Sequence, residues 1–255
     1  MCRWLTYSGR PIYLGALIFE PENSLIQQSL HARKTQVTTN GDGFGVGWYG
    51  GRKVPGIYRD ILPAWNDANL KSLAHQVEAC LFFAHVRAST GTATSRANCH
   101  PFGLDRWMFM HNGQIGGYDR GRRRLEALLP DDLYRHRHGT TDSELFFLLL
   151  FVHGLEDDPP EAIRRTIRLV DTAAAEAGAT EPFRMTAALS DGAHVYAIRH
   201  STDDKPPSLY WGGAMDALTV VSEPLDGALA HWTEVDPERL LIAAPGHAPR
   251  VEALN

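Results

Sequence analysis

The chain has 255 residues, of which 44% are hydrophobic and 22% are charged, and its formal net charge is −5 at pH 7. These values are typical of a soluble globular protein that is long enough to bury a substantial core. A negative net charge argues against general nucleic-acid binding, and the longest apolar run, Leu145 to Val152, is far too short to span a membrane. We therefore expect a single domain over residues 1–255, with neither nucleic acid nor a membrane as a partner.

The cysteines and histidines follow no metal-binding or disulfide pattern. Cys2, Cys80 and Cys99 are an odd number of cysteines without a close pair, and none of the 12 histidines stands in a His-Glu-x-x-His arrangement. We expect no metal and no cofactor, and a metal hydrolase is disfavoured. The opening Met1–Leu5 is not followed by the long apolar run of a secretory leader, so we expect a cytoplasmic protein. Cys80, at the head of an apolar segment, should pack as a small hydrophobic residue.

The first hundred residues predict short helices and strands. Apolar residues at helical spacing indicate three helices, over 12–19, 23–32 and 67–78. Strands are expected over 2–8, 44–49 and 80–86. Asn40-Gly41-Asp42-Gly43 is a loop or hairpin signal, and the strand after it has glycine at alternate positions. Glycine within a strand indicates a bend or the close approach of another backbone.

The rest of the chain predicts a helical middle followed by strands. Helices are expected over 117–128, 143–153 and 160–177. Strands are expected over 107–110, 183–190, 193–199, 208–212, 217–222, 239–244 and 249–253. The first of these helices carries a run of arginines, Arg120, Arg122, Arg123 and Arg124, which indicates a solvated face rather than an anion-binding site. The order of elements predicts a mixed α+β fold, with sheets packed on each other and helices outside.

The start of the chain offers a catalytic group. If Met1 is removed, Cys2 carries a thiol and a free α-amino group. Such an amine titrates at roughly 7.7–8.0, so it could act as a base for the thiol nucleophile beside it. The alternative is that Cys2 is simply the second residue and has no role.

Acyl transfer by Cys2 would also need a substrate clamp and an oxyanion hole. Arg87 stands where the strand over 80–86 ends, and it could bind a carboxylate with help from the Thr90 hydroxyl. The amide of Asn112 and the backbone N–H of Gly113 could bind an oxyanion. The alternatives are a surface arginine and an ordinary Asn-Gly turn.

Two more residues have open alternatives. Asp142 could bind an amine, or it could cap the helix over 143–153, as Thr141 also could. His100 could line a pocket, or it could be a partly buried ring. A serine triad is not favoured, because the sequence has no Gly-x-Ser-x-Gly elbow.

Taken in order, these motifs resemble those of the class II glutamine amidotransferases, which are N-terminal-nucleophile hydrolases. The resemblance runs from residue 2 to about residue 225. It rests on Cys2, Asn-Gly-Asp-Gly-Phe-Gly at 40–45, His-x-Arg-x-x-Thr-Gly at 85–91, Asn-x-His-Pro at 98–101, His-Asn-Gly at 111–113, Thr-Asp-Ser-Glu at 141–144 and Val-Ser-Glu-Pro-Leu at 221–225.

The resemblance implies a four-layer αββα sandwich with two antiparallel sheets inside. It also implies that Cys2 attacks the side-chain amide of glutamine, with its own α-amino group as the base. Asn112 and the N–H of Gly113 would form the oxyanion hole. A γ-glutamyl thioester would form, ammonia or an amine would leave, and water would release glutamate.

The same resemblance implies the binding groups for the substrate. Arg87 and Thr90 would hold the α-carboxylate, and Asp142 would hold the α-amino group. His100, within the Asn-x-His-Pro motif, is included as a further substrate-binding residue.

The sequence differs from the synthase-linked members of this family. Those members have Trp after the clamp arginine and His after the threonine, where this chain has Ala88 and Gly91. Phe102 follows the Asn-x-His-Pro motif where they have His. The chain looks more like the stand-alone branch, which includes a glutathione-degradation component and the ergothioneine-pathway γ-glutamyl hydrolase.

Three functions are therefore compared. The first is an amidohydrolase that acts on a small γ-glutamyl substrate, either glutamine or a γ-glutamyl peptide or thiol. The second is a glutaminase subunit that delivers ammonia to a separate synthase partner, and a peptidase partner is a related possibility. The third is a non-catalytic glutamine-sensing protein, which would not need the nucleophile.

Overall fold

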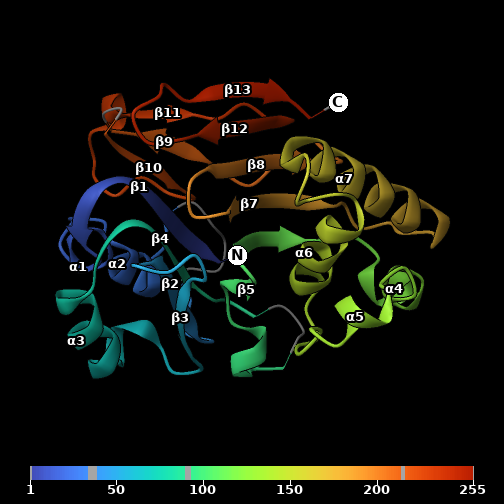
Figure 1. The fold of residues 1–255 in the computed structure, drawn as a ribbon, viewed down its shortest axis with the longest axis horizontal. Helices are drawn as coiled ribbons and strands as arrows, with labels where there is room; N and C mark the ends of the chain where they lie inside the picture. The colour runs from blue at the N-terminus through green and yellow to red at the C-terminus, as the bar shows by residue number, and fades with distance from the viewer. Residues whose placement is uncertain (1, 34–38, 90–92, 214–215, 255) are drawn as a thin grey trace.

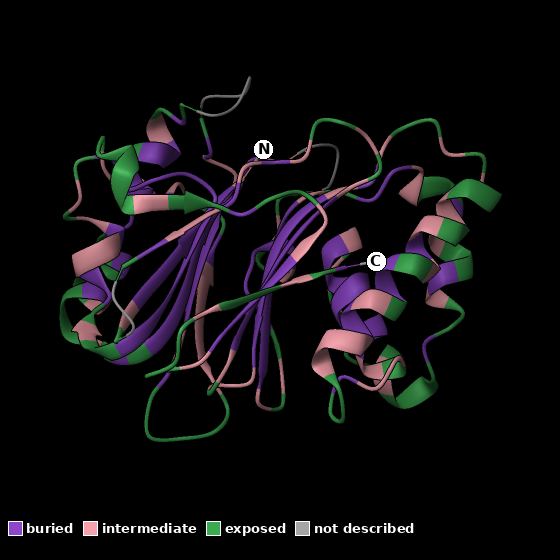
Figure 2. Cartoon of the chain, turned by 90° about the horizontal axis from the view of Figure 1, so that it is seen from above, coloured by how far each residue is buried: buried purple, intermediate pink, exposed green. Residues whose placement is uncertain are grey.

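Two antiparallel sheets pack face to face between two layers of helices, and Figure 2 shows the four layers side by side. The structure is a computed structural model that describes residues 2–33, 39–89, 93–213 and 216–254. This arrangement confirms the α+β sandwich of four αββα layers predicted from the sequence.

The first sheet has seven strands in the described residues. Their order is β11 (Trp232–Glu234), β9 (Tyr210–Gly212), β10 (Ala217–Val221), β1 (Arg3–Tyr13), β4 (Glu78–Val86), β2 (Phe44–Tyr49) and β3 (Gly56–Asp60). The second sheet has six, in the order β13 (Arg250–Ala253), β12 (Arg239–Ala243), β8 (Val195–Ser201), β7 (Arg184–Ser190), β6 (Trp107–Gln114) and β5 (Phe102–Leu104). β1 and β4 are therefore central in the first sheet, and β7 and β6 lie inside the second.

Each sheet has helices on its outer face (Figure 1). The first sheet packs against α1 (Gly15–Ile18), α2 (Leu25–Leu30) and α3 (Ala68–Gln76). The helical middle of the chain supplies α4 (Tyr118–Glu126), α5 (Asp131–Tyr134), α6 (Asp142–Val152) and α7 (Pro159–Glu176). Short 3-10 turns lie at Ala64–Asn66, Arg96–Asn98 and Leu229–His231. None of the helices in the described residues is both long and apolar enough to cross a membrane.

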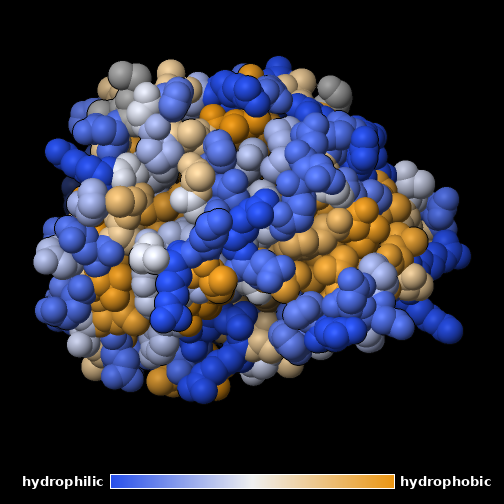
Figure 3. Space-filling view, in the orientation of Figure 1, coloured by the Kyte–Doolittle hydropathy of each residue, from blue (hydrophilic) through white to orange (hydrophobic). Residues whose placement is uncertain are grey.

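α6 is the most deeply buried helix beside the second sheet. Its residues 145–150 are all buried, because β6 packs on one side of the helix and α7 on another. Phe109 of β6 stacks on Phe146 and Phe147 with ring centroids 5.8 and 5.6 Å apart. Hydrophobic residues are visible around α6 and α7 in Figure 3. A helix that is apolar around most of its circumference is expected to be enclosed in this way.

The inner faces of the two sheets approach closely where β2 carries glycine. A Cβ atom on Gly45 would lie 2.2 Å from the backbone oxygen of His100, and one on Gly47 would lie 2.2 Å from Sδ of Met108. The alternate glycines of this strand therefore make room for the second sheet, as the sequence pattern indicated.

Several local predictions were wrong. Ile12 and Tyr13, predicted as helical, belong to β1, which has an irregular register between Ser8 and Ile12, so the helix is confined to Gly15–Ile18. Of the two alternatives left open for Asn112 and Gly113, the ordinary turn is excluded, because both residues lie within β6 and pair with β7. Cys80 is exposed, since the alternation of β4 turns it away from the core.

We predict that a side chain at Gly45 destabilises the protein. Gly45→Ala places a methyl group against the His100 backbone, and overpacking of this kind costs about 1–3 kcal/mol. Urea unfolding of wild type and variant measures the loss. Gly50→Ala is the matched control, because a Cβ atom there meets nothing within 4 Å. Equal stabilities for Gly45→Ala and the control would show that the sheets can separate without cost.

Candidate active site

A cavity of about 490 Å³ opens at the end of the sandwich where β1 begins and β4 and β6 end. Both sheets and the first turn of α6 contribute to its wall. Of the residues predicted from the sequence, the cavity wall contains Cys2, Arg87, His100, Gly113 and Asp142. Asn112 is buried beside Gly113, and Thr90 lies outside the described residues. The structure thus brings five of the predicted residues, from five separate segments, to one cavity.

The thiol of Cys2 faces the backbone of Ala88 at the end of β4. Its Sγ atom lies 3.4 Å from the Ala88 N–H, which can donate to it, and 3.6 Å from the Ala88 carbonyl oxygen. Burial raises the pKa of the Cys2 thiol, and the hydrogen bond from Ala88 opposes that rise. Burial is the largest of these effects, so the thiol is harder to ionise than a solvent-exposed cysteine.

A buried ion pair holds the chain beside Cys2. Nε of Arg3 lies 3.0 Å from Oε2 of Glu223, and the two side chains are 1% and 2% exposed. Nη1 of Arg3 donates to the backbone oxygen of Cys2 at 2.9 Å. Asn23 donates to the other carboxylate oxygen of Glu223, and the Trp4 N–H donates to the Ser222 hydroxyl. The motif at 221–225 therefore fixes the start of β1, a role that the sequence did not reveal.

The loop at 40–43 positions the predicted carboxylate clamp. Nη1 of Arg87 donates to the backbone oxygen of Asp42 at 3.2 Å, and Nη2 donates to the hydroxyl of Ser89 at the same distance. The Asp42 carboxylate accepts the N–H of Ser89 at 2.7 Å, and the Arg87 N–H donates to the Gly43 carbonyl. Asp42 thus orders the segment that carries Arg87, a contact that the turn signal at 40–43 did not reveal.

Near the end of β6, the backbone at Gly113 lies very close to the backbone of β7. Gly113 has φ of +144°, and a Cβ atom there would lie 1.9 Å from the backbone oxygen of Arg184. No other residue fits that position without displacing β7. The side-chain oxygen of Asn112 is buried and has no hydrogen-bond partner within the described residues. An oxyanion would be bound by the amide nitrogen of this side chain, which is the donor, and not by this oxygen.

Thr141, not Asp142, caps helix α6. The hydroxyl of Thr141 accepts the N–H of Glu144 at 3.2 Å. The carboxylate of Asp142 instead accepts the N–H of Ile115 at 2.8 Å and that of Ser143 at 2.7 Å. An ionised carboxylate has further acceptor positions, so Asp142 can still bind a cation in the cavity. The cap that the sequence left open between Thr141 and Asp142 is therefore Thr141, and amine binding by Asp142 stays a prediction.

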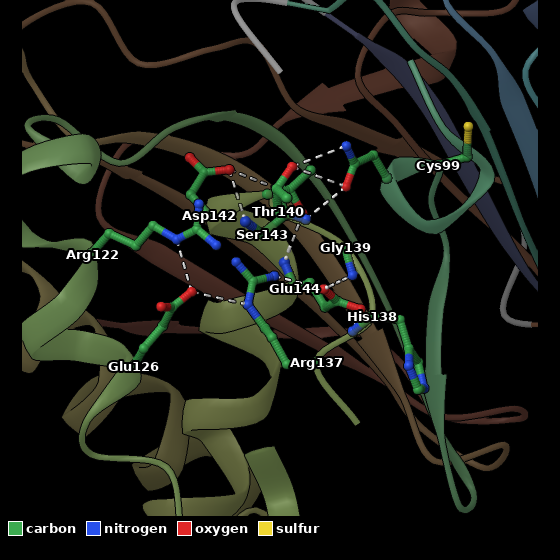
Figure 4. A network of polar contacts seen from close by, with 12 residues as sticks. Cys99, Arg122, Glu126, Arg137, His138, Gly139, Thr140, Asp142, Ser143 and Glu144 are labelled. Carbon is green, nitrogen blue, oxygen red and sulfur yellow. Dashed lines mark hydrogen bonds and ion pairs between the residues drawn. The ribbon is translucent and has the colours of Figure 1, made fainter. Parts of the chain in front are cut away.

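The residues on either side of Asp142 tie this turn to its surroundings (Figure 4). Asn98 accepts the N–H of Thr140 at 2.8 Å, which joins the Asn-x-His-Pro segment to the start of α6. Glu144 forms an ion pair with Arg137 at 2.6 Å, and both side chains are almost fully buried. Glu144 also accepts the backbone N–H groups of His138 and Gly139. The turn is therefore rigidly held on both sides of the predicted amine anchor.

Three buried histidines lie at the cavity: His100 and His111 line it, and His85 packs beside them. His85 donates from Nε2 to the backbone oxygen of His111 at 3.2 Å, and its ring centroid is 4.3 Å from that of His100. Nδ1 of His111 lies 2.7 Å from the hydroxyl of Ser143. Burial lowers the pKa of all three rings, that of His85 to about 3. The histidines are therefore neutral at physiological pH.

The described residues contain no group of three or more His, Cys, Asp or Glu side chains that could hold a metal ion. The cavity wall combines the Cys2 thiol, the guanidinium groups of Arg87 and Arg120, the carboxylates of Asp119, Asp142 and Glu181, and the backbone of Gly113. Together with the sandwich of two antiparallel sheets, this arrangement defines an N-terminal-nucleophile type of amidohydrolase site.

The comparison with known families agrees with the site. The model of the family "Glutamine amidotransferases class-II" matches residues 18–206 of this chain. The match covers more than half of the 255 residues, so the chain belongs to the class II glutamine amidotransferases.

Individual relatives cover almost the whole chain. It is 32% identical to the "Probable glutamine amidotransferase DUG3" of Saccharomyces cerevisiae, over 94% of this chain and 81% of the yeast protein. It is 28% identical to the "Gamma-glutamyl-hercynylcysteine sulfoxide hydrolase" of Mycolicibacterium smegmatis, over 95% of each protein. A solved glutamine aminotransferase class-II domain protein from Silicibacter pomeroyi is similar with a TM-score of 0.78 and 36% identity, over 99% of each chain.

We predict that the buried histidines make the protein sensitive to acid. Their pKa values are lowered by folding, so the unfolded chain binds more protons below about pH 6.5 and stability falls as the pH decreases. For His85, whose folded pKa is about 3, the loss between pH 7 and pH 5 is about 2 kcal/mol. The measurement is the free energy of unfolding in urea across this pH range.

The test variant for this prediction is His85→Gln, which keeps an N–H donor for the His111 carbonyl but does not titrate. Its stability should fall less steeply with acid than that of wild type. His247→Gln, at an exposed histidine, should keep the wild-type slope. An unchanged slope in His85→Gln would show that this ring does not contribute.

Proposed function

We propose that residues 1–255 form one glutamine amidotransferase domain that hydrolyses a γ-glutamyl amide, either glutamine or a γ-glutamyl peptide or thiol. The observation that carries the proposal is the presence of Cys2, Arg87, Gly113 and Asp142 around one cavity. Membership of the class II glutamine amidotransferases supports it, as does similarity to a γ-glutamyl-hercynylcysteine sulfoxide hydrolase.

In the proposed reaction, removal of Met1 exposes the α-amino group of Cys2. The amine takes the proton from the thiol, and the sulfur attacks the δ-carbonyl carbon of the γ-glutamyl group. The carbonyl oxygen becomes an oxyanion that accepts hydrogen bonds from the Asn112 amide and the Gly113 N–H. The C–N bond then breaks, the amine leaves with the proton from the base, and a thioester remains on Cys2. Water attacks the thioester, which releases glutamate and the free thiol.

Substrate binding uses the charges of the cavity wall. Arg87 binds the α-carboxylate, Thr90 assists it, and Asp142 binds the α-ammonium group. His100 contacts the substrate from the floor as a neutral ring. Because the α-carbon groups are fixed at two points, the δ-amide is oriented toward Cys2 before attack.

A glutaminase subunit that supplies ammonia to a separate synthase would use the same site. Activity that rises when a protein partner binds would favour that function over hydrolysis alone. A protein that only senses glutamine would not need Cys2, so retention of full cellular function by Cys2→Ala would favour it. The chemistry proposed here requires a reduced thiol, in keeping with a cytoplasmic location.

We predict that Cys2→Ala abolishes release of glutamate from glutamine, glutathione and other γ-glutamyl compounds. The alanine variant lacks the atom that forms the thioester, whereas Cys80→Ala removes an exposed thiol and should keep full activity. Intact-mass analysis should show that active wild-type protein lacks Met1. If no compound of the panel is hydrolysed by Met1-processed protein, the catalytic proposal is wrong.

We also predict that substitutions at Arg87 and Asn112 affect different kinetic constants, KM for the first and kcat for the second. Arg87→Ala should mainly raise KM, since it removes the carboxylate clamp. Asn112→Ala should mainly lower kcat, by about 10²–10³, because an oxyanion donor acts in the transition state. Steady-state kinetics with the best substrate of the panel measure both, and Arg124→Ala on exposed α4 is the control. A rise in KM alone for Asn112→Ala contradicts the oxyanion role.

A further inference from the structure

The cavity extends beyond the groups that the glutamyl half of a substrate requires. Its wall continues from Gly113 through residues 114–120, and Glu181 completes it from the loop before β7. In the proposed function, Arg87 and Asp142 already account for the α-carboxylate and α-ammonium groups. Arg120 and Glu181 therefore line a part of the cavity that the glutamyl half does not require, and ammonia as a leaving group would need neither.

This outer wall is built from closely packed backbone. A Cβ atom on Gly116 would lie 1.8 Å from the backbone oxygen of Glu181, and one on Gly117 would lie 2.5 Å from the Cβ of Ala179. The two glycines allow the segment after Gly113 to lie directly against the loop that carries Glu181. The first turn of α4 then begins at Tyr118 and brings Arg120 to the cavity.

Arg120 and Glu181 form an ion pair at this outer wall. Nη2 of Arg120 lies 2.8 Å from Oε2 of Glu181, and the side chains are 49% and 55% exposed. A guanidinium group has five N–H donors, so this contact leaves donors available for a second carboxylate. The ion pair orients the guanidinium group and leaves some of its N–H donors available.

The position of the pair follows from the strand register. Gly113 pairs with Met185, and Gln114 pairs with Arg184, the first residue of β7. Glu181 lies three residues before Arg184, so it is close in sequence to the part of β7 that adjoins the predicted oxyanion hole. Arg87 comes from β4 in the other sheet. The Arg120–Glu181 pair thus lies on the same cavity wall as the Gly113 backbone. The scissile amide is proposed to lie against that backbone.

The other arginines of the same run have different surroundings. Arg122 pairs with Glu126 within α4, and Arg124 pairs with Glu176 of α7. Neither these two nor Arg123 belongs to the cavity wall. The run is therefore a solvated face, as the sequence predicted, except at Arg120.

We propose that Arg120, oriented by Glu181, binds a carboxylate on the leaving group. This inference rests on the proposed γ-glutamyl hydrolase function and narrows its substrate class to γ-glutamyl amides of amino acids or short peptides. In such substrates the leaving amine belongs to a residue whose carboxylate remains ionised at neutral pH. Arg120 is then a specificity-determining residue, and Glu181 is a positioning residue.

The test compares two substrates that differ only in this carboxylate, γ-glutamylglycine and γ-glutamylglycinamide. Wild type should hydrolyse the acid with a kcat/KM about tenfold higher than the amide, the size expected of a charge-assisted contact at a half-exposed site. Arg120→Ala should remove this preference by lowering kcat/KM for the acid alone. Glu181→Gln should reduce the preference in the same direction, and added salt should reduce it in wild type.

Arg124→Ala is the matched control, because it removes a charge from the same helix outside the cavity and should keep the preference. An equal loss on both substrates in Arg120→Ala, or no loss on either, overturns the inference. Hydrolysis of glutamine alone, or a preference for the amide, also overturns it while the proposed hydrolase function stands. If wild type hydrolyses none of the three compounds, the proposed function itself fails, and this inference fails with it.

Discussion

The first turn of α6 is the structural element on which the site depends, because consecutive side chains there bind different segments. Thr140 contacts Asn98, Asp142 accepts the Ile115 N–H, and Ser143 contacts His111. Glu144 holds the preceding loop through Arg137 and two backbone N–H groups. Ser143 thereby binds His111, just before Asn112, and Asp142 binds Ile115, two residues after Gly113. The proposed amine anchor, Asp142, and the strand that carries the proposed oxyanion hole are parts of one hydrogen-bonded unit.

A buried ion pair holds the chain at Cys2, the proposed nucleophile. Arg3 and Glu223, 220 residues apart, form an ion pair that is almost fully buried. Burying two charges costs free energy, and removing one partner of such a pair costs about 3–5 kcal/mol. Such a pair is better explained by the need for a defined geometry than by stability. Here Arg3 binds the carbonyl of Cys2, so the pair helps to determine where Cys2, the residue before β1, lies relative to Ala88.

Periodicity in the sequence was sufficient for a mixed α+β fold with packed sheets and outer helices, because the buried helices and the alternating strands leave clear apolar patterns. The four-layer order was predicted from the family resemblance. The short strands β3, β5 and β11 were missed, since each has only a few residues and depends on a neighbouring strand. The Asn112-Gly113 dipeptide has a local preference for turns, but pairing with β7 overrides it. Likewise, nothing local distinguishes Arg120 from the other arginines of α4, because only the packing of Gly116 against Glu181 brings it to the cavity.

The neutral histidines restrict how the thiol of Cys2 can be activated. In a cysteine–histidine pair, an imidazolium stabilises the thiolate, but His85, His100 and His111 have lowered pKa values and carry no charge at neutral pH. Within the described residues, both hydrogen-bond contacts of the Cys2 sulfur are made with the Ala88 backbone. Burial meanwhile raises the pKa of this thiol. A base that belongs to Cys2 itself satisfies these constraints, because the α-amino group of a processed chain needs no other side chain to bring it to the sulfur.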